Sequence, residues 1–422
     1  MFRCRAVIFA LKIKQSWGET ILTDYKEPTV TASAALTEAI PDFTAPVFFD
    51  VLKQLRGHEA GSYLMALAAL CDGVESRFFR SQQDAQITYP LFDAEYNRPV
   101  FQSLSFGQHR RYFVGSQSDT VSPEAAFNSR DKLRTKKILH RNKLATPFGG
   151  GASADHLMAI QEIAKAGIRR VVVKPIAGSL AKGVMLNLSP RAAAEYVVSR
   201  PSETFIVEQQ IIGREYRVYV AGNRMLGAFA RPPQHVIGDG SATIQALMQA
   251  KAESRLPNPL FNSRPLDFAM AERVLQRRND RMDRVPARGE VVGLASDTLI
   301  NEAGDRNYAT NTISKAAADL CVAATKAMGL VAAGVDVMLD QRGVPYVLEV
   351  NVRAMISLHC FPHPIGHWNL ELPRGIIRSF LPIDRITPRR VIGFDYAALK
   401  TELFREGRAV GGVNAADFAS FG

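Results

Sequence analysis

The stretch Gly334–Asp340 (GVDVMLD), followed closely by Tyr346–Asn351 (YVLEVN), decides the fold of this chain. Side chains alternate in character along both runs, as they do in half-buried β-strands. The segment Gln341–Gly343 between the runs contains the glycine that a tight hairpin turn favours. The pattern therefore predicts an antiparallel hairpin, with a two-residue turn at Arg342 and Gly343.

Three oxygen-bearing side chains share one face of this predicted hairpin. A two-residue turn places Asp336 directly opposite Glu349, and Asn351 lies two residues further along. Two carboxylates and an amide oxygen on one rigid hairpin suit Mg²⁺, which binds hard oxygen ligands. A carboxylate pair in an otherwise apolar strand is costly unless a cation compensates it. The alternative is the polar outer face of an ordinary hairpin.

The composition indicates a globular protein of two or three domains. The chain has 422 residues, 47% apolar and 22% charged, without a compositional sign of disorder. Its net charge of +11 would favour phosphates, acidic metabolites or nucleic acid if it were clustered. The arginines between residues 273 and 290 are interspersed with acidic residues. We therefore expect a solvated helix or lid there, and no nucleic-acid partner.

Cysteine usage and hydropathy indicate a cytoplasmic protein. The four cysteines are scattered without a Cys-x-x-Cys pair, which argues for a reducing compartment and against a disulfide framework or zinc site. The apolar run at residues 6–11 is too short for a secretory core and is interpreted as a first strand. No apolar run approaches transmembrane length, so we expect no membrane partner.

Helices and strands alternate between these features. Ser129–Asn142 reads as a helix that Asn128 and Ser129 are suited to cap. Further helices are expected at residues 63–70, 154–166, 191–198, 267–280 and 313–328, and strands at residues 170–175, 205–208, 216–221 and 225–231.

A glycine-containing loop follows the strand that ends near Lys174. It contains Gly178, Ser179, Lys182 and Gly183. Backbone amides in such a loop can surround phosphate oxygens, because glycine permits close approach, and the lysines neutralise phosphate charge. It is not a Walker loop, since no Gly-Lys-Ser/Thr opens a helix. Taken alone, such a loop is more often a simple turn.

Two glutamates lie seven residues apart in the segment VEQQIIGREYR, which begins at Val207. Glu208 could accept the adenine amino proton, while backbone groups nearby, around Gln209 and Ile211, meet the ring edge. Glu215 could hold ribose hydroxyls. Either glutamate alone is better interpreted as an exposed turn residue. The lysine loop, the two glutamates and the acidic hairpin occur in this order along the chain, and together they favour a nucleotide site over exposed turns.

With these motifs in order, residues 128–367 resemble the ATP-grasp ligases. The segment DKLRTK at residues 131–136 resembles the part of D-alanine–D-alanine ligase that supplies the first ATP-binding lysine. The resemblance implies that Lys132 and Lys174 bind phosphates. It implies that Glu208, Ile211 and Glu215 bind adenine and ribose. It also implies that Asp336, Glu349 and Asn351 bind two Mg²⁺ ions, which Mn²⁺ could replace.

Within this superfamily, residues 231–244 (RPPQHVIGDGSATI) are similar to the cyanophycin synthetase group and to the ligase half of bifunctional glutathione synthetases. His359, after the metal asparagine, strengthens that similarity, although a structural role for it is equally consistent. Ala354 and Met355 depart from the proline and glycine of that group. Gly334 stands where D-alanine–D-alanine ligase has an arginine. These departures concern the substrates and leave the ATP and magnesium chemistry intact.

The resemblance implies an α/β (α+β) architecture in which two subdomains grip ATP. We expect a small N-terminal α/β domain at residues 1–125, the smaller ATP-grasp subdomain at 126–210, and the metal-bearing subdomain at 211–370. Residues 371–422 remain as a C-terminal tail or helix.

The implied activity is ATP-dependent ligation of a carboxylate to an amine through an acylphosphate, with release of ADP and phosphate. Catalysis would rest on positioning and charge neutralisation, with Arg231, Arg217 or Arg353 stabilising an oxyanion or gripping a carboxylate. The expected partners are small molecules such as an amino acid, a dipeptide or an acidic metabolite. The alternatives are a phosphotransferase that stops at phosphoryl transfer and a basic nucleic-acid-binding protein. Ligases of this type often form dimers or tetramers, and the sequence leaves the oligomeric state open.

Overall fold

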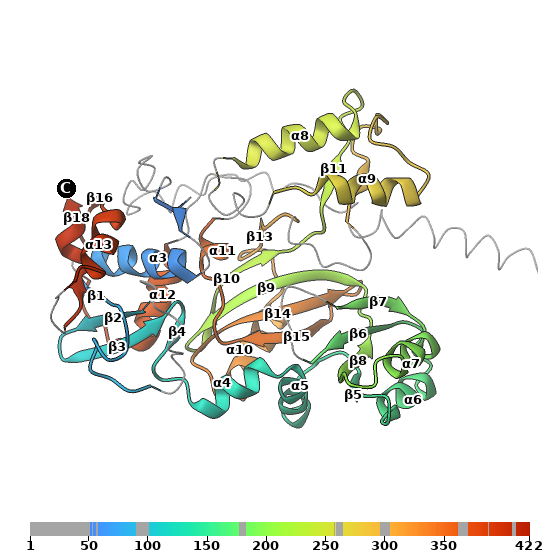
Figure 1. Ribbon diagram of the computed structural model, residues 1–422, viewed down its shortest axis with the longest axis horizontal. Helices are drawn as coiled ribbons and strands as arrows, with labels where there is room; N and C mark the ends of the chain where they lie inside the picture. The colour runs from blue at the N-terminus through green and yellow to red at the C-terminus, as the bar shows by residue number, and fades with distance from the viewer. Residues whose placement is uncertain are drawn as a thin grey trace, which may run out of the picture.

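The predicted hairpin forms one edge of a five-stranded antiparallel sheet (Figure 1). The computed structural model describes residues 51–52, 54–55, 58–89, 101–176, 183–256, 258, 265–295, 304–361, 370–386, 388–406 and 411–422. The expected first strand at residues 6–11 and the loop residues Gly178, Ser179 and Lys182 lie outside this described part.

The central sheet is apolar on one face and carries charged side chains on part of the other, where Tyr219 and Phe229 are also buried. Its strand order is β13 (Asn307–Tyr308), β10 (Arg224–Ala230), β9 (Gly213–Ala221), β14 (Ala332–Asp340) and β15 (Pro345–Asn351). Helix α10 (Lys315–Ala327) packs on the apolar face, where Val218, Val335 and Val337 are fully buried. Because side chains alternate along each strand, Arg217 and Asp336 project from the opposite face.

The hairpin itself departs from the expected turn in two ways that cancel. Asp340 and Val344 bracket a three-residue turn, in which Gly343 has a φ of +80°. Leu339 therefore pairs with Pro345, one residue out of the predicted register. A bulge at Leu348 then restores it, since Val337 pairs with Val347 and Asp336 with Glu349. The predicted two-residue turn was wrong, and the predicted Asp336–Glu349 pairing is confirmed.

A smaller four-stranded sheet lies beside the central one, at the lower right of Figure 1. Its order is β5 (Gly149–Ala152), β8 (Phe205–Gln209), β6 (Val171–Pro175) and β7 (Met185–Leu188). Helices α6 (Met158–Lys165) and α7 (Pro190–Val198) share its core, which includes the buried Val173 and Phe205. Residues 210–212 connect β8 directly to β9, so the two sheets meet at the predicted adenine segment.

The helix expected at Ser129–Asn142 is two helices, and the predicted start was wrong. Helix α4 (Pro123–Arg130) ends at Asp131, whose backbone is extended, with φ −102°. Asp131 Oδ1 accepts hydrogen bonds from the backbone N–H groups of Leu133 (2.8 Å) and Arg134 (3.0 Å), and α5 (Lys132–Arg141) begins there. Aspartate is a favoured N-cap because its side chain satisfies amides that lack a helical partner. The cap places Lys132 in the first turn of α5.

A third body, at the top of Figure 1, contains the arginine-rich segment. Strands β11 (His235–Ile237) and β12 (Val291–Gly293) pair with each other, and α8 (Ile244–Arg255) and α9 (Phe268–Arg277) share their core. Arg284 forms ion pairs with Asp280 (2.7 Å) and Glu290 (2.9 Å). These pairs show locally neutralised charge, which agrees with the expected solvated segment.

The remaining body unites residues from both ends of the described chain. Its sheet contains β17 (Val413–Asn414), β1 (Glu75–Phe79), β2 (Phe101–Phe106), β3 (His109–Val114) and β4 (Gln117–Ser118), in that order. Helix α3 (His58–Cys71) packs in the same core as α12 (Glu371–Phe380), α13 (Tyr396–Leu403) and the β16 (Val391–Phe394) and β18 (Ala419–Phe421) pair. Buried Asp72 receives ion pairs from Arg374 (3.0 Å) and Arg378 (3.2 Å), which link α3 to α12.

The other predicted helices and strands within the described residues are present, with ends shifted by a few positions. Within this part of the chain, none of the helices combines the length and apolar character that a bilayer crossing requires.

Candidate active site

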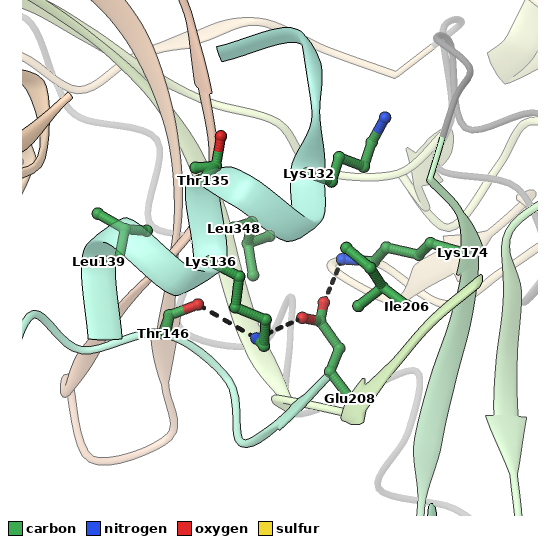
Figure 2. Close-up of a pocket in the computed structure, with 9 residues that line it drawn as sticks. All are labelled: Lys132, Thr135, Lys136, Leu139, Thr146, Lys174, Ile206, Glu208 and Leu348. Atoms are coloured by element: carbon green, nitrogen blue, oxygen red, sulfur yellow. Dashed lines mark hydrogen bonds and ion pairs between the residues drawn. The ribbon is translucent and has the colours of Figure 1, made fainter. Parts of the chain in front are cut away.

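A narrow pocket lies where α5 meets both sheets (Figure 2). Helix α5 supplies one wall, β6 and β8 supply the second, and the bulged Leu348 of β15 supplies the third. The lining residues are Lys132, Thr135, Lys136, Leu139, Thr146, Lys174, Ile206, Glu208 and Leu348. The pocket thus combines aliphatic side chains with three lysines, which suit anionic groups.

Glu208 is the centre of an ion network at the floor of this pocket. Its carboxylate is buried, with 5% of the residue exposed. Lys136 Nζ donates to Oε2 at 2.9 Å, and Lys174 Nζ donates to Oε1 from the opposite side (Figure 2). Burial alone would raise the pKa of Glu208, but the two lysine charges hold it at about 2. The same pairing raises the pKa of Lys174 against the effect of burial. Both charges are therefore present at neutral pH.

Lys136 is a site residue that sequence reasoning missed. It lies one helical turn after Lys132 on α5, and it also donates to Pro147 O and Thr146 Oγ1. The i, i+4 spacing of the two lysines would have indicated a shared helix face. Lys136 anchors Glu208, whereas Lys132 Nζ lies 4.0 Å from Glu349 Oε1, towards the hairpin.

The predicted metal aspartate is held by two arginines. Arg217, directly opposite Asp336 in β9, donates from Nε to Oδ1 and from Nη2 to Oδ2 (2.8 Å). Arg231 Nη1 lies 3.7 Å from Asp336 Oδ1 and donates to Glu215 Oε1 at 2.6 Å. Burial raises the pKa of Glu215, as does the charge of Asp336, while Arg231 opposes both. Arginine and carboxylate side chains thus alternate on this part of the central sheet and form a charge lattice of Arg217, Arg231, Glu215 and Asp336.

The three predicted metal ligands are neighbours on the hairpin. Asp336 pairs with Glu349 across the hairpin, and Asn351 pairs with Gly334, two residues along β14. Asn351 Nδ2 is buried without a hydrogen-bond partner among the described residues, which is costly for an amide. No group of three or more His, Cys, Asp or Glu residues that could hold a metal ion occurs among the described residues. Two carboxylates and one amide fit Mg²⁺, which takes few protein ligands and completes its shell with phosphate oxygens.

The remaining predicted site residues within the described part are Gln209, Ile211, Gly183 and Arg353. Gln209 ends β8, and its backbone N–H donates to Phe148 O (2.7 Å), while Ile211 lies in the link to β9. Gly183 has a φ of +73° and lies beside Pro175. Arg353 Nε donates to Gln117 Oε1 (3.1 Å), at the junction with the N-terminal sheet.

His359 is a buried residue whose two ring nitrogens both lack a hydrogen-bond partner among the described residues, and its structural and functional interpretations both stay predictions. It is 4% exposed, and its ring lies edge-on to Phe229 (4.7 Å) and Tyr219 (5.6 Å). Burial lowers its pKa to about 3, and the charge of Arg217 adds to this effect. His359 is therefore a neutral core residue at physiological pH.

Known proteins resemble this chain in both sequence and structure. No protein-family model matches it. The glutathione biosynthesis bifunctional protein GshAB of Mannheimia succiniciproducens is 28% identical over 287 residues, covering 62% of this chain and 37% of that protein. The GshAB protein of Pasteurella multocida is 26% identical over 306 residues, covering 67% and 39%.

A solved structure shows the same similarity at the level of the fold. The bifunctional glutathione synthetase from Pasteurella multocida superposes with a TM-score of 0.57 and 21% identity, over 79% of this chain and 44% of that chain. The chain therefore spans less than half the length of the relatives it matches. It shares the fold of the bifunctional glutathione synthetase, and the predicted resemblance to the bifunctional glutathione synthetases is confirmed.

Proposed function

We propose that the chain is an ATP-dependent carboxylate–amine ligase that forms a peptide or amide bond. One observation carries this proposal: a lysine-lined pocket between two sheets lies next to the cross-strand carboxylate pair Asp336 and Glu349. Lys132 belongs to both, because it lines the pocket and lies 4.0 Å from Glu349. A triphosphate needs both neutralising cations and metal-binding oxygens at such a junction.

In this proposal the nucleotide base lies between Ile206 and Leu348, and Glu215 meets the ribose. Lys132 and Lys174 neutralise phosphate oxygens. Asp336, Glu349 and Asn351 would hold Mg²⁺, which supplies charge neutralisation to the phosphates. Lys174 is already ion-paired to Glu208, so the lysine is positioned by a buried partner before a ligand enters.

The proposed reaction has two steps. A substrate carboxylate oxygen bonds to the γ-phosphorus as the bond to ADP breaks, which forms an acylphosphate. An amine nitrogen then bonds to the acyl carbon, phosphate leaves, and the amine loses a proton to solvent. Arg217 and Arg231 are the arginines beside the carboxylate pair, and they are our candidates for stabilising negative charge on the acyl oxygen.

A paired substrate screen tests this function. The purified protein is incubated with ATP, Mg²⁺ and pairwise combinations of amino acids, dipeptides and small acids, and ADP and phosphate are measured. The dipeptide precursor of glutathione with glycine is included, because the relatives are named for glutathione biosynthesis. Release of ADP and phosphate that requires both a carboxylate and an amine supports the ligase. ADP formation with a phosphorylated product and no amine requirement would instead identify a phosphotransferase.

We also propose that the protein acts in the cytoplasm, as its cysteine usage predicts. Homodimer or homotetramer formation stays a prediction that size-exclusion chromatography with light scattering would test.

A further inference from the structure

Arg217 occupies both carboxylate oxygens of Asp336. Its Nε and Nη2 atoms form a two-pronged ion pair with Oδ1 and Oδ2. The side chains are 15% and 8% exposed, so water competes little for either group. A guanidinium keeps its charge at all accessible pH values, so this pair cannot be released by deprotonating the arginine.

Gly334 lies in contact distance of the Arg217 side chain that reaches Asp336. A Cβ at residue 334 would lie 3.4 Å from Arg217 Cδ and 3.5 Å from Nη1. A longer side chain at this position would therefore compete with the arginine for the same space. Gly334, which stands where D-alanine–D-alanine ligase has an arginine, thus lies beside Arg217 of the adjacent strand.

Arg231 differs from Arg217 in its principal partner. It lies 2.6 Å from Glu215 and only at 3.7 Å from Asp336. Glu215 therefore holds Arg231, and Arg217 is the main cation on Asp336.

We infer that Arg217 is an internal competitor for the divalent cation at Asp336. A divalent cation on an oxygen of Asp336 shares that oxygen with the guanidinium and places a second positive charge beside it, so the cation and Arg217 compete for the carboxylate. Cation binding and release of Arg217 are therefore linked, and the released guanidinium becomes available to an anionic group of the substrate. This inference rests on the proposed metal site and adds a mechanism that sets its affinity.

Binding of Mn²⁺ alone tests the inference without substrate turnover. Free Mn²⁺ is measured by electron paramagnetic resonance during titration of wild-type protein and four variants: Arg217→Gln, Arg231→Gln, Arg214→Gln and Asp336→Asn. Arg214 is an exposed residue of the same strand and controls for loss of one positive charge. We expect Arg217→Gln to bind Mn²⁺ about tenfold more tightly, which corresponds to loss of one charge-assisted pair. Arg231→Gln and Arg214→Gln should change the affinity much less.

The outcomes separate this inference from the proposed function. If Asp336→Asn loses Mn²⁺ binding but Arg217→Gln binds no more tightly than Arg214→Gln, the competition is refuted and the metal site stands. If Asp336→Asn binds Mn²⁺ as wild type does, the metal site and the inference both fail. Arg217→Lys provides a second test if the glutamine variant does not fold. A lysine makes one contact in place of two, so its Mn²⁺ affinity should lie between wild type and the tighter value.

Discussion

Asp336 and Glu349 are direct cross-strand partners, although the turn between their strands is one residue longer than the pairing requires. The bulge at Leu348 absorbs the extra residue and places this leucine on the wall of the lysine-lined pocket. One local irregularity thus aligns the carboxylates and completes the pocket. Bulges often serve in this way beside functional sites.

The carboxylate pair leads to a first prediction. Glu349→Gln removes one negative charge from the proposed metal site and keeps the size of the side chain. We expect kcat for ADP formation to fall by about two orders of magnitude or more, because charge neutralisation of the phosphates depends on the metal. Steady-state assays at saturating Mg²⁺ measure it. A variant that keeps most of its activity would remove Glu349 from the site.

The pocket lysines should control nucleotide affinity. Lys132→Met and Lys174→Met each remove one cation from the pocket, and we expect about tenfold weaker ATP binding for each. Lys137→Met is the matched control, since Lys137 lies on the same helix as Lys132 and is exposed. Isothermal titration with a non-hydrolysable ATP analogue measures the affinity. Equal effects of Lys137→Met and Lys132→Met would show that only overall charge matters.

Glu208 should make stability depend on acid pH. Its pKa is about 2 in the folded protein, below the ordinary value of 4.5. Ionised Glu208 therefore stabilises the fold above about pH 4.5, and this contribution is lost as the pH falls towards 2. It amounts to about 3 kcal/mol at roughly 1.4 kcal/mol per pKa unit.

Comparison with Glu208→Gln isolates this contribution. The difference in unfolding free energy between wild type and the variant should shrink as the pH falls through that window. Urea unfolding followed by circular dichroism at several pH values measures it. A difference that is constant from pH 6 to pH 3 would contradict the prediction.

Gly334 should tolerate no side chain. A Cβ there would lie 2.4 Å from the Cβ of Ala354, which is closer than atoms can approach. We expect Gly334→Ala to destabilise the protein by about 1–3 kcal/mol through overpacking. Gly150→Ala is the control, because its Cβ would meet Ala159 at an ordinary 3.5 Å. Thermal unfolding of the two variants gives the comparison, and equal melting temperatures would show that the hairpin shifts to accept the methyl group.

Several parts of the site could be predicted from sequence because they depend on local pattern. Alternation of side chains indicated that Asp336 and Glu349 share a face of a hairpin. The order of lysine, glutamate and hairpin motifs indicated the fold, which the structural comparison confirms. Asp131 shows the limit of such patterns, since the sequence predicted Asn128 and Ser129 as the caps, whereas the backbone extends at Asp131 and that residue caps α5.

The sequence by itself determined the two strands of the hairpin, the strands around Lys174, Glu208 and Arg217, and which face of the hairpin carries the carboxylates. These follow from side-chain periodicity and from the chemistry of each side chain. Only the tertiary structure decided that Lys136 anchors Glu208, that Arg217 grips Asp336 and that Arg231 holds Glu215. These pairs join residues between 16 and 119 positions apart. Their formation depends on how two sheets and a helix pack, and no local pattern records that packing.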